Sequence, residues 1–220
     1  MEKWLLNKKL DSGYLLGKNN LICKTAVPKE LKKEFSKSGF NDVFRLYNPF
    51  LLKDMDKAVD RIDAAIKGRQ RVIVFGNNGI DGILSTSIIY KALMKLGADV
   101  SYYIPDGNSG EKGLSIAAVE YVKNLAYDVI IVVGCGNSSD YEAEYAKALG
   151  MDVIIVDYNQ SVSGKSDAIV INPNRNDCEY PFKDLTGCGV AFKFIQALWH
   201  YYGLNGCEDF FRYRCNCFNI

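Results

Sequence analysis

Four short runs constrain the fold of this chain more than any other feature, because each is apolar at both odd and even positions. They are RVIVFG at 71–76, DVSYYIP at 99–105, DVIIVVG at 128–134 and DVIIVDY at 152–158. Strands of this kind need cover on both faces of their sheet, as in parallel α/β sheets. Helix-like patterns separate the runs, and a fifth run, AIVINP, precedes GVAFKFIQALWHYYG. The expected fold class is therefore α/β, a parallel sheet flanked by helices.

Three segments are expected along the 220 residues. Residues 1–50 are polar and irregular, with one expected helix at PKELKKEFSKSG, and form an N-terminal appendage. Residues 51–205 form the α/β domain. Its first helix is amphipathic, with apolar residues at helical spacing: Leu52, Met55, Val59, Ile62 and Ile66. Residues 206–220 form a tail without apolar periodicity.

The charge balance and the apolar runs bear on nucleic-acid and membrane binding, although they do not exclude a local basic groove. The 27 basic and 26 acidic residues give a net charge of +1, so no global field attracts nucleic acid or a membrane surface. No run reaches the length of about 18 apolar residues that a transmembrane helix needs. The start, MEKWLLNKKL, lacks the apolar centre of a signal peptide. We therefore expect a cytoplasmic protein without a membrane partner.

Glycine-rich or polar loops follow the expected strands, and they indicate where a ligand would bind. The loops are GNNGIDG, IPDGNSGEKG, GCGNSS and DYNQS. The carboxyl ends of parallel strands lie at one edge of a sheet, so these loops should share one rim. The glycines of the first loop, at 76, 79 and 82, match neither the dinucleotide-binding frame nor the Walker frame. A nucleotide cofactor is therefore not favoured.

Six segments, in this order and spacing, carry a family resemblance. They are NPFLLKDMDKAVDRIDAAI, the GxxxxDG turn, GADVSYYIPD, VGCG, ALGMDVIIVDYN and INPNRNDCEYPFKDLTGCGVAFKFIQAL. The chain resembles the RecJ-like single-stranded-DNA-specific exonucleases of the DHH phosphoesterase family. The resemblance implies a parallel α/β domain with two manganese or magnesium ions at the strand ends. It also implies phosphodiester hydrolysis from the 5′ end of single-stranded DNA.

The chain departs from the family at the positions that the resemblance assigns to metal ligands. The family has D-x-D-x-D-G in the first loop, D-C-G in the second and D-H-H in the third. The corresponding positions that lack a carboxylate or imidazole here are Asn77, Gly79, Gly134, Tyr158 and Asn159. Asp81 and Asp157 remain, and we expect them to shape turns by accepting backbone hydrogen bonds. No intact catalytic or metal-binding residue is expected.

Other positions bear on the site more weakly. Gly187 and Gly189, in the TGCGVAFK block that resembles the family, are the expected substrate-binding positions. His200 is the one histidine of the sequence and falls within ALWHYY, a helix pattern. We expect it to be a helix residue and not a metal ligand.

Three functional interpretations follow. In the first, the chain is a pseudoenzyme without a metal cofactor, whose surface binds single-stranded DNA or replication and repair proteins. Its core runs are intact while the losses gather on one rim, which favours this interpretation. In the second, it is a residual manganese- or magnesium-dependent exonuclease of DNA repair or recombination. In the third, it is a non-functional fragment.

The tail motivates the third interpretation. Permissible codons for FFRYRCNCFNI, residues 210–220, read in a second frame as F-L-D-I-V-A-I-A-S-T. This is the continuation that the family resemblance leads us to expect. The hypothesis is a frameshift in a T-rich run, with loss of the family's fourth motif and of the domains that follow it.

Overall fold

The computed structural model describes residues 47–105, 113–135, 140–159, 167–207 and 210. The chain divides into two units, Met1–Phe44 and Arg45–Ile220, and every described residue belongs to the second. The helix expected at 28–39 and most of the tail at 206–220 therefore lie outside the described residues. Among the described helices, none combines the length and hydrophobicity that a membrane crossing requires.

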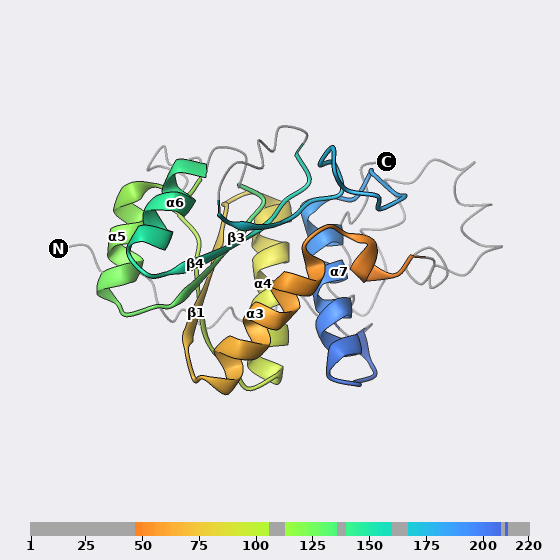
Figure 1. Ribbon diagram of the computed structural model, residues 1–220, viewed down its shortest axis with the longest axis horizontal. Helices are drawn as coiled ribbons and strands as arrows, with labels where there is room; N and C mark the ends of the chain where they lie inside the picture. Colours follow the sequence, from red (N-terminus) through yellow and green to blue (C-terminus); the bar gives the residue numbers. More distant parts are fainter. Residues whose placement is uncertain (1–46, 106–112, 136–139, 160–166, 208–209, 211–220) are drawn as a thin grey trace, which may run out of the picture. The chain divides into compact units, whose positions relative to one another are not determined.

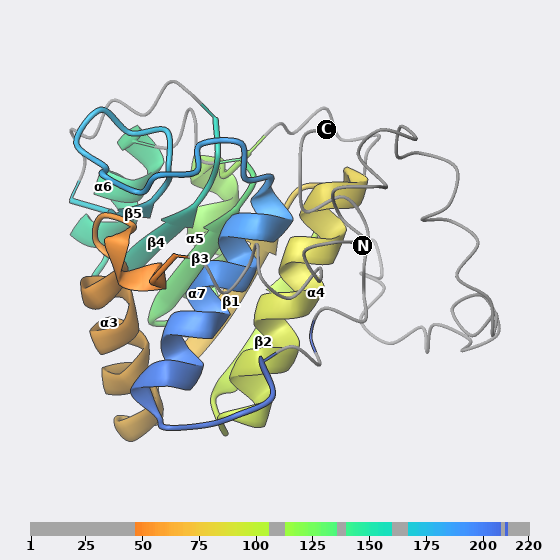
Figure 2. The same cartoon turned by 90° about the vertical axis from the view of Figure 1, so that its right-hand side faces the viewer.

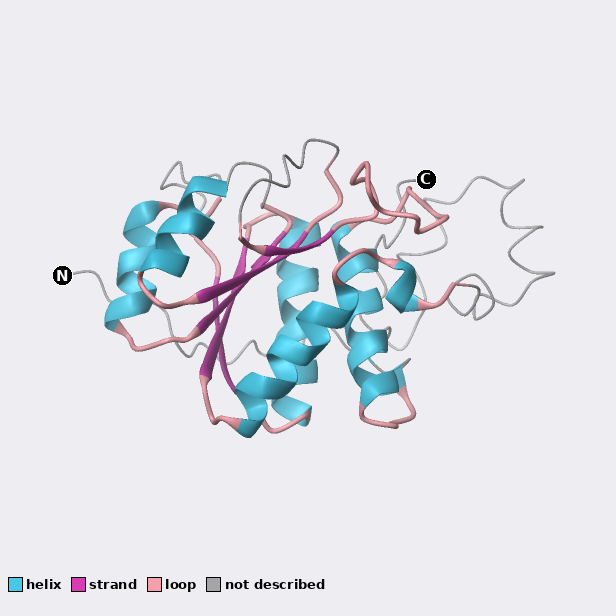
Figure 3. Cartoon of the chain, viewed as in Figure 1, coloured by secondary structure: helices cyan, strands magenta, loops and turns pink. Residues whose placement is uncertain are grey.

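The described part of the chain forms one five-stranded sheet. Its strands are β1 Arg71–Gly76, β2 Asp99–Tyr103, β3 Val129–Val133, β4 Asp152–Val156 and β5 Ile169–Ile171. All four strand pairs are parallel, and the order across the sheet is β2-β1-β3-β4-β5. The α/β prediction with a parallel sheet is confirmed, and the strands run side by side through the centre of Figure 3.

One strand differs from the sequence prediction. β3, in the middle of the sheet, is buried at all five positions, as expected of a strand covered on both faces. β2 was expected to be covered in the same way, but it is an edge strand with a single neighbour, β1. Asp99 is exposed and the Tyr102 side chain is 48% exposed. The prediction of cover on both faces was wrong for β2, because hydropathy does not reveal that its tyrosines lie at a partly exposed surface.

Helices cover both faces of the sheet. The described elements are η1 Pro49–Leu51, α3 Met55–Lys67, α4 Ile80–Lys95, α5 Ile116–Asn124, α6 Asp140–Ala148 and α7 Gly187–Tyr201. Helices α3, α4 and α7 lie on one face, in front of the sheet in Figure 2, and α5 and α6 lie on the other (Figure 1). Side-chain caps fix two helix starts: Ser115 accepts from the Ala118 N–H, and Thr186 accepts from the Gly189 N–H.

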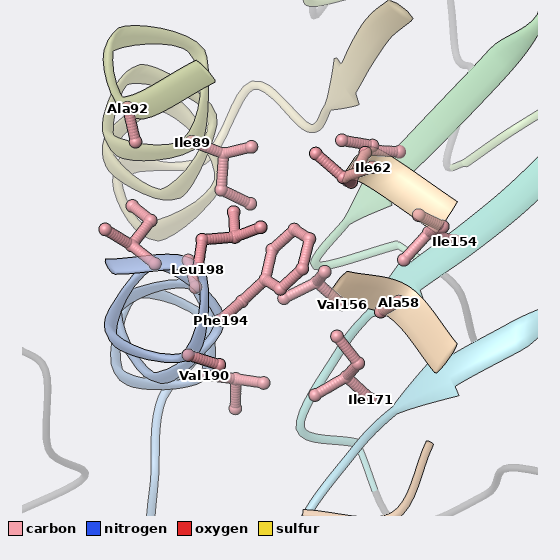
Figure 4. Packing of buried hydrophobic residues seen from close by; sticks show 14 of the residues in the cluster. Ala58, Ile62, Ile89, Ala92, Ile154, Val156, Ile171, Val190, Phe194 and Leu198 are labelled. Atoms are coloured by element: carbon pink, nitrogen blue, oxygen red, sulfur yellow. The ribbon is translucent and has the colours of Figure 1, made fainter. Parts of the chain in front are cut away.

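The alternation of side chains along the strands divides the core into two layers. In β1, Val72 and Val74 belong to the layer under α3, α4 and α7, whereas Ile73 and Phe75 belong to the layer under α5 and α6. Figure 4 shows the first layer, in which Phe194 of α7 lies among apolar side chains from the neighbouring helices and strands. Full burial of such a side chain contributes about 1.5–3 kcal/mol.

The segment before α3 packs against this domain. Pro49 is buried, and the ring of Tyr47 meets that of Tyr180 edge-on, with centroids 5.8 Å apart. The buried Lys193 ammonium donates to the Tyr47 carbonyl at 3.0 Å, and burial lowers the pKa of Lys193 to about 8. These contacts anchor the chain where it enters the α/β domain.

Candidate functional site at the carboxyl edge of the sheet

The carboxyl ends of the parallel strands place the candidate residues along one edge. Asn77 follows β1, Gly134 follows β3, Asp157 follows β4 and Asn172 follows β5. In the order β2-β1-β3-β4-β5, the chain leaves β1 toward β2 on one side and continues from β3 toward β4 and β5 on the other. The strand order therefore reverses between β1 and β3, which is the position where ligands of open α/β sheets bind. The expected shared rim is confirmed for these loops. Residues 106–112 of the loop after β2 lie outside the described residues.

Asn77 uses both polar atoms of its side chain within the rim. Its Oδ1 accepts from the Gly79 N–H at 2.9 Å, and its Nδ2 donates to the Gly134 carbonyl at 2.7 Å. Gly79 precedes α4 as its N-terminal cap and contributes no side chain. Gly134, at φ 65°, contributes only backbone atoms. These three expected ligand positions therefore offer amide and backbone groups that already bond to one another.

Asp81 connects the first turn of α4 to the start of α7. Its Oδ1 accepts from the Cys188 N–H at 2.9 Å, and a Cβ added to Gly187 would lie only 2.4 Å from its Oδ2. Burial raises the pKa of Asp81, while hydrogen bonds from Cys188, Gly187 and Thr186 partly oppose that rise. A carboxylate beside the positive end of a helix dipole is a favourable arrangement. Asp81 thus serves as a cap for α7.

The first N–H groups of α7 have acceptors within the chain. Cys188 donates to Asp81, and Gly189 donates to the Thr186 hydroxyl at 3.3 Å. Gly187, the other expected substrate-binding residue, lies against the Asp81 carboxylate. A phosphate at this helix terminus would have to displace those acceptors. Substrate binding by Gly187 and Gly189 stays a prediction.

Asp157 is fully buried and organises the loop after β4. Its Oδ1 accepts from the Tyr158 N–H at 2.7 Å, the Asn159 N–H at 3.3 Å and the Asn159 Nδ2 at 2.9 Å. This geometry is typical of a short acceptor that closes a turn on its own backbone. The Asn159 amide, at an expected ligand position, is thereby directed toward Asp157.

Two asparagines that the sequence analysis did not single out support the same loop. The buried Asn172 donates to the Asn159 carbonyl at 2.9 Å and accepts from the Asn174 N–H at 2.8 Å. Asn174 donates to the Tyr158 carbonyl at 2.6 Å. The available signal was positional, since Asn172 directly follows an apolar run and so lies at the same edge as the other loops.

Tyr158 fills space beside the start of α7. A Cβ added to Gly187 would lie 3.4 Å from the Tyr158 Cδ1, so the ring is close to that helix terminus. Burial, followed by the charges of Asp81 and Asp157, raises the pKa of the Tyr158 phenol. The phenol is therefore protonated at neutral pH and does not replace an anionic donor.

His200 lies far from this edge. It is in the last turn of α7, about 20 Å along the axis from Gly187 at a rise of about 1.5 Å per residue. Its ring contacts Phe50 edge-on, with centroids 5.8 Å apart. The histidine is a helix residue, as expected, and does not contribute to the rim.

The fold and the edge define a class of protein: a doubly covered parallel α/β domain whose candidate site lies where the strand order reverses. Residues 71–210 match the DHH family, N-terminal domain. The chain belongs to this family, and the resemblance seen in its motifs is confirmed.

Relatives identify the branch of the family. The single-stranded-DNA-specific exonuclease RecJ of Bacillus subtilis (strain 168) is 39% identical over 153 residues, which are 69% of this chain and 20% of that protein. RecJ of Salmonella typhimurium is 37% identical over 149 residues, 67% of this chain and 26% of that protein. The domain is therefore RecJ-like and related to single-stranded-DNA exonucleases. It spans about a fifth to a quarter of the length of these relatives.

Solved structures agree with this placement. The crystal structure of exonuclease RecJ bound to manganese matches 72% of this chain and 40% of its own, with a TM-score of 0.64 and 28% identity. RecJ from Thermus thermophilus in complex with Mn²⁺ matches 72% of this chain and 22% of its own, with a TM-score of 0.61 and 28% identity. These relatives hold a divalent metal on the same fold.

The described residues at this edge do not fit such a metal. Manganese and magnesium require several oxygen donors, with carboxylates to offset their charge. No group of three or more His, Cys, Asp or Glu side chains in the described ranges is arranged to hold a metal ion. Asn77 is engaged at both polar atoms, one oxygen of Asp157 closes a turn, and Asp81 caps α7. The donor set is that of a hydrogen-bonded rim.

Proposed function

We propose that this chain is a RecJ-like DHH-family domain that does not hydrolyse phosphodiesters and acts as a binding module. One observation carries the proposal. At the carboxyl edge of the sheet, the positions where the family resemblance expects metal ligands carry amide, phenol or backbone groups. Those of Asn77 and Asn159 bond to neighbouring protein groups.

The chemistry of the relatives explains why this difference matters. Two-metal hydrolysis clamps the attacking and the leaving oxygen between a pair of divalent ions. Such a pair brings four positive charges, which clustered carboxylates must offset. Asp81 and Asp157 are the retained carboxylates of the motifs, and each is used to hold backbone N–H groups. Without the ions, no described side chain at the edge is arranged to activate a water molecule or to stabilise the leaving oxygen.

A preserved fold without its chemistry is consistent with a role in binding. The proposed partners are single-stranded DNA or a protein of replication or repair, because the RecJ relatives act on single-stranded DNA. The net charge of +1 supplies no strong general attraction for DNA. Pull-down of replication and repair proteins, with an unrelated α/β domain as the control bait, tests the protein-binding part.

Manganese titration by calorimetry, with a parallel 5′-end nuclease assay on single-stranded DNA, tests the loss of activity. We expect neither saturable manganese binding in the micromolar range nor release of nucleotides, because the described part of the rim lacks clustered anionic donors. RecJ of Bacillus subtilis serves as the positive control.

A variant carrying N77D, G79D, G134D, Y158H and N159H shows whether restoring the family's donors restores manganese binding. Micromolar manganese affinity or nucleotide release by the unmodified chain contradicts the proposal and supports the residual exonuclease. The fragment hypothesis concerns the gene, and sequencing the bases that encode residues 210–212 and those downstream tests it.

A further inference from the structure

The side chain of Asn77 joins two loops that are distant in sequence. Its Nδ2 reaches the carbonyl of Gly134, 57 positions further along the chain, at 2.7 Å. Its Oδ1 simultaneously accepts from the Gly79 N–H at 2.9 Å. One residue therefore fixes the turn after β1 and ties it to the turn after β3, at the position where the strand order reverses.

The surroundings leave little room for this side chain to move. The backbone of Gly82 approaches so closely that a Cβ there would lie 2.0 Å from the Asn77 Oδ1 and 2.7 Å from the Asn77 carbonyl. On the other side, a Cβ added to Gly134 would lie 3.2 Å from Nδ2. Two glycines thus enclose the amide, and its geometry is defined from both ends.

The identity of residue 77 decides what can lie between the two loops. An amide presents an N–H to the Gly134 carbonyl, so a proton bridges the nitrogen and the oxygen. A carboxylate of the same shape would place two oxygen acceptors about 2.7 Å apart, which is repulsive unless a proton or a cation lies between them.

We propose that the Asn77 amide takes the bridging place of a cation and holds the β1 and β3 loops together without one. The proposal goes beyond the loss of catalysis, because it assigns the group that joins the β1 and β3 loops. It predicts that the loops do not depend on divalent metal for their conformation.

Thermal unfolding of the unmodified protein, N77D and N78D tests the bridge. Asn78 is exposed in the same loop, so N78D adds the same charge without touching the bridge. In EDTA at pH 7 we expect N78D to melt close to the unmodified protein. We expect N77D to melt about 3–10 °C lower, because the part-buried donor to the Gly134 carbonyl is lost and two acceptors face each other.

Two further readouts separate a proton bridge from a merely structural contact. The difference in melting temperature between N77D and N78D should disappear as the pH falls toward about 4, because the protonated carboxyl again donates to the Gly134 carbonyl. The melting temperature of the unmodified protein should be the same in EDTA and in millimolar manganese.

Three results overturn the proposal. They are equal melting temperatures of N77D and N78D at pH 7, a difference between these melting temperatures that does not change with pH, or saturable stabilisation of the unmodified protein by manganese. If N77D does not fold, hydrogen exchange on the unmodified protein decides. Protection of the amides at 79 and 134 should be equal in EDTA and in manganese, and protection that requires manganese overturns the proposal. Failure of the proposed function is seen separately, as nuclease activity.

Discussion

The hydrophobic layers of this domain and the carboxyl edge of its sheet differ in what stabilises them. In β3, all five side chains are buried, and the layer around Phe194 is filled by aliphatic and aromatic groups from α3, α4, α7 and the strands. One residue beyond β3, Gly134 has no side chain, and its carbonyl is held by an amide from the β1 loop. Close packing of apolar side chains stabilises the first region, and a few directed hydrogen bonds stabilise the second.

This difference explains how the fold of such a domain can be separated from chemistry at its edge. Each strand points side chains into both layers, and the layers are built from these side chains and from the apolar faces of the helices. The rim residues Asn77, Gly79 and Gly134 belong to neither layer. A change from carboxylate to amide at the edge can therefore remove metal affinity while leaving the α/β domain folded.

The largest expected effect lies in the hydrophobic layers. Replacing the fully buried Phe194 by alanine should reduce the free energy of unfolding by about 3–5 kcal/mol, through lost burial and a residual cavity. Urea unfolding followed by circular dichroism measures it. The matched control is Ile80→Ala, since the Ile80 side chain is 75% exposed. Similar losses for the two variants would show that this layer is not the main source of stability.

A smaller effect is expected from crowding the rim. Gly82→Ala should cost about 1–3 kcal/mol, because its Cβ would lie 2.7 Å from the Asn77 carbonyl and 2.0 Å from the Asn77 Oδ1. Gly79→Ala is the matched control: its φ of −73° suits alanine, and its Cβ would lie 3.1 Å from the Asn77 Oδ1. Chemical denaturation compares the two variants. Equal losses would mean that the rim tolerates crowding and that the Asn77 geometry is not tightly enclosed.

The smallest expected effect is a change in the pH dependence of the free energy of unfolding, caused by Asp81. Because burial raises its folded-state pKa above the ordinary value of 3.8, the folded state binds the proton more tightly than the unfolded state. The contribution of Asp81 to the free energy of unfolding is fully present below pH 3.8 and is lost as the pH rises through the raised pKa. The stability of the unmodified protein relative to D81N should therefore fall with rising pH, as measured by urea unfolding across acid pH.

Asp63, in α3 and away from the rim, should change the pH dependence of the free energy of unfolding in the opposite direction. The hydrogen bond from Lys67 lowers the pKa of Asp63, with further help from Tyr202 and Tyr201 and against the effect of burial. Its contribution is present above the ordinary value of 3.8 and is lost as the pH falls through the lowered pKa. Relative to D63N, the unmodified protein should thus gain stability with rising pH. The same slope for both variants would contradict the proposed difference between the two carboxylates.

Local patterns were sufficient to predict most of the scaffold. The apolar runs located all five strands, and helical spacing located α3 and α7, because period and hydropathy reflect cover by neighbouring layers. The same reasoning failed for β2, where Tyr102 and Tyr103 are compatible with either a central or an edge strand. It also passed over Asn172 and Asn174, since asparagine after a strand is equally typical of an ordinary turn.

By itself the sequence determined the parallel α/β class, the family and the set of loops that meet at one edge, because these depend on residue types and their order along the chain. The tertiary structure alone decided what the remaining polar groups at that edge do. Asp81 bonds to Cys188, 107 positions away, and Asn77 bonds to Gly134, 57 positions away. Hydrogen bonds depend on distance and direction in space, and no periodicity along the chain encodes partners so far apart.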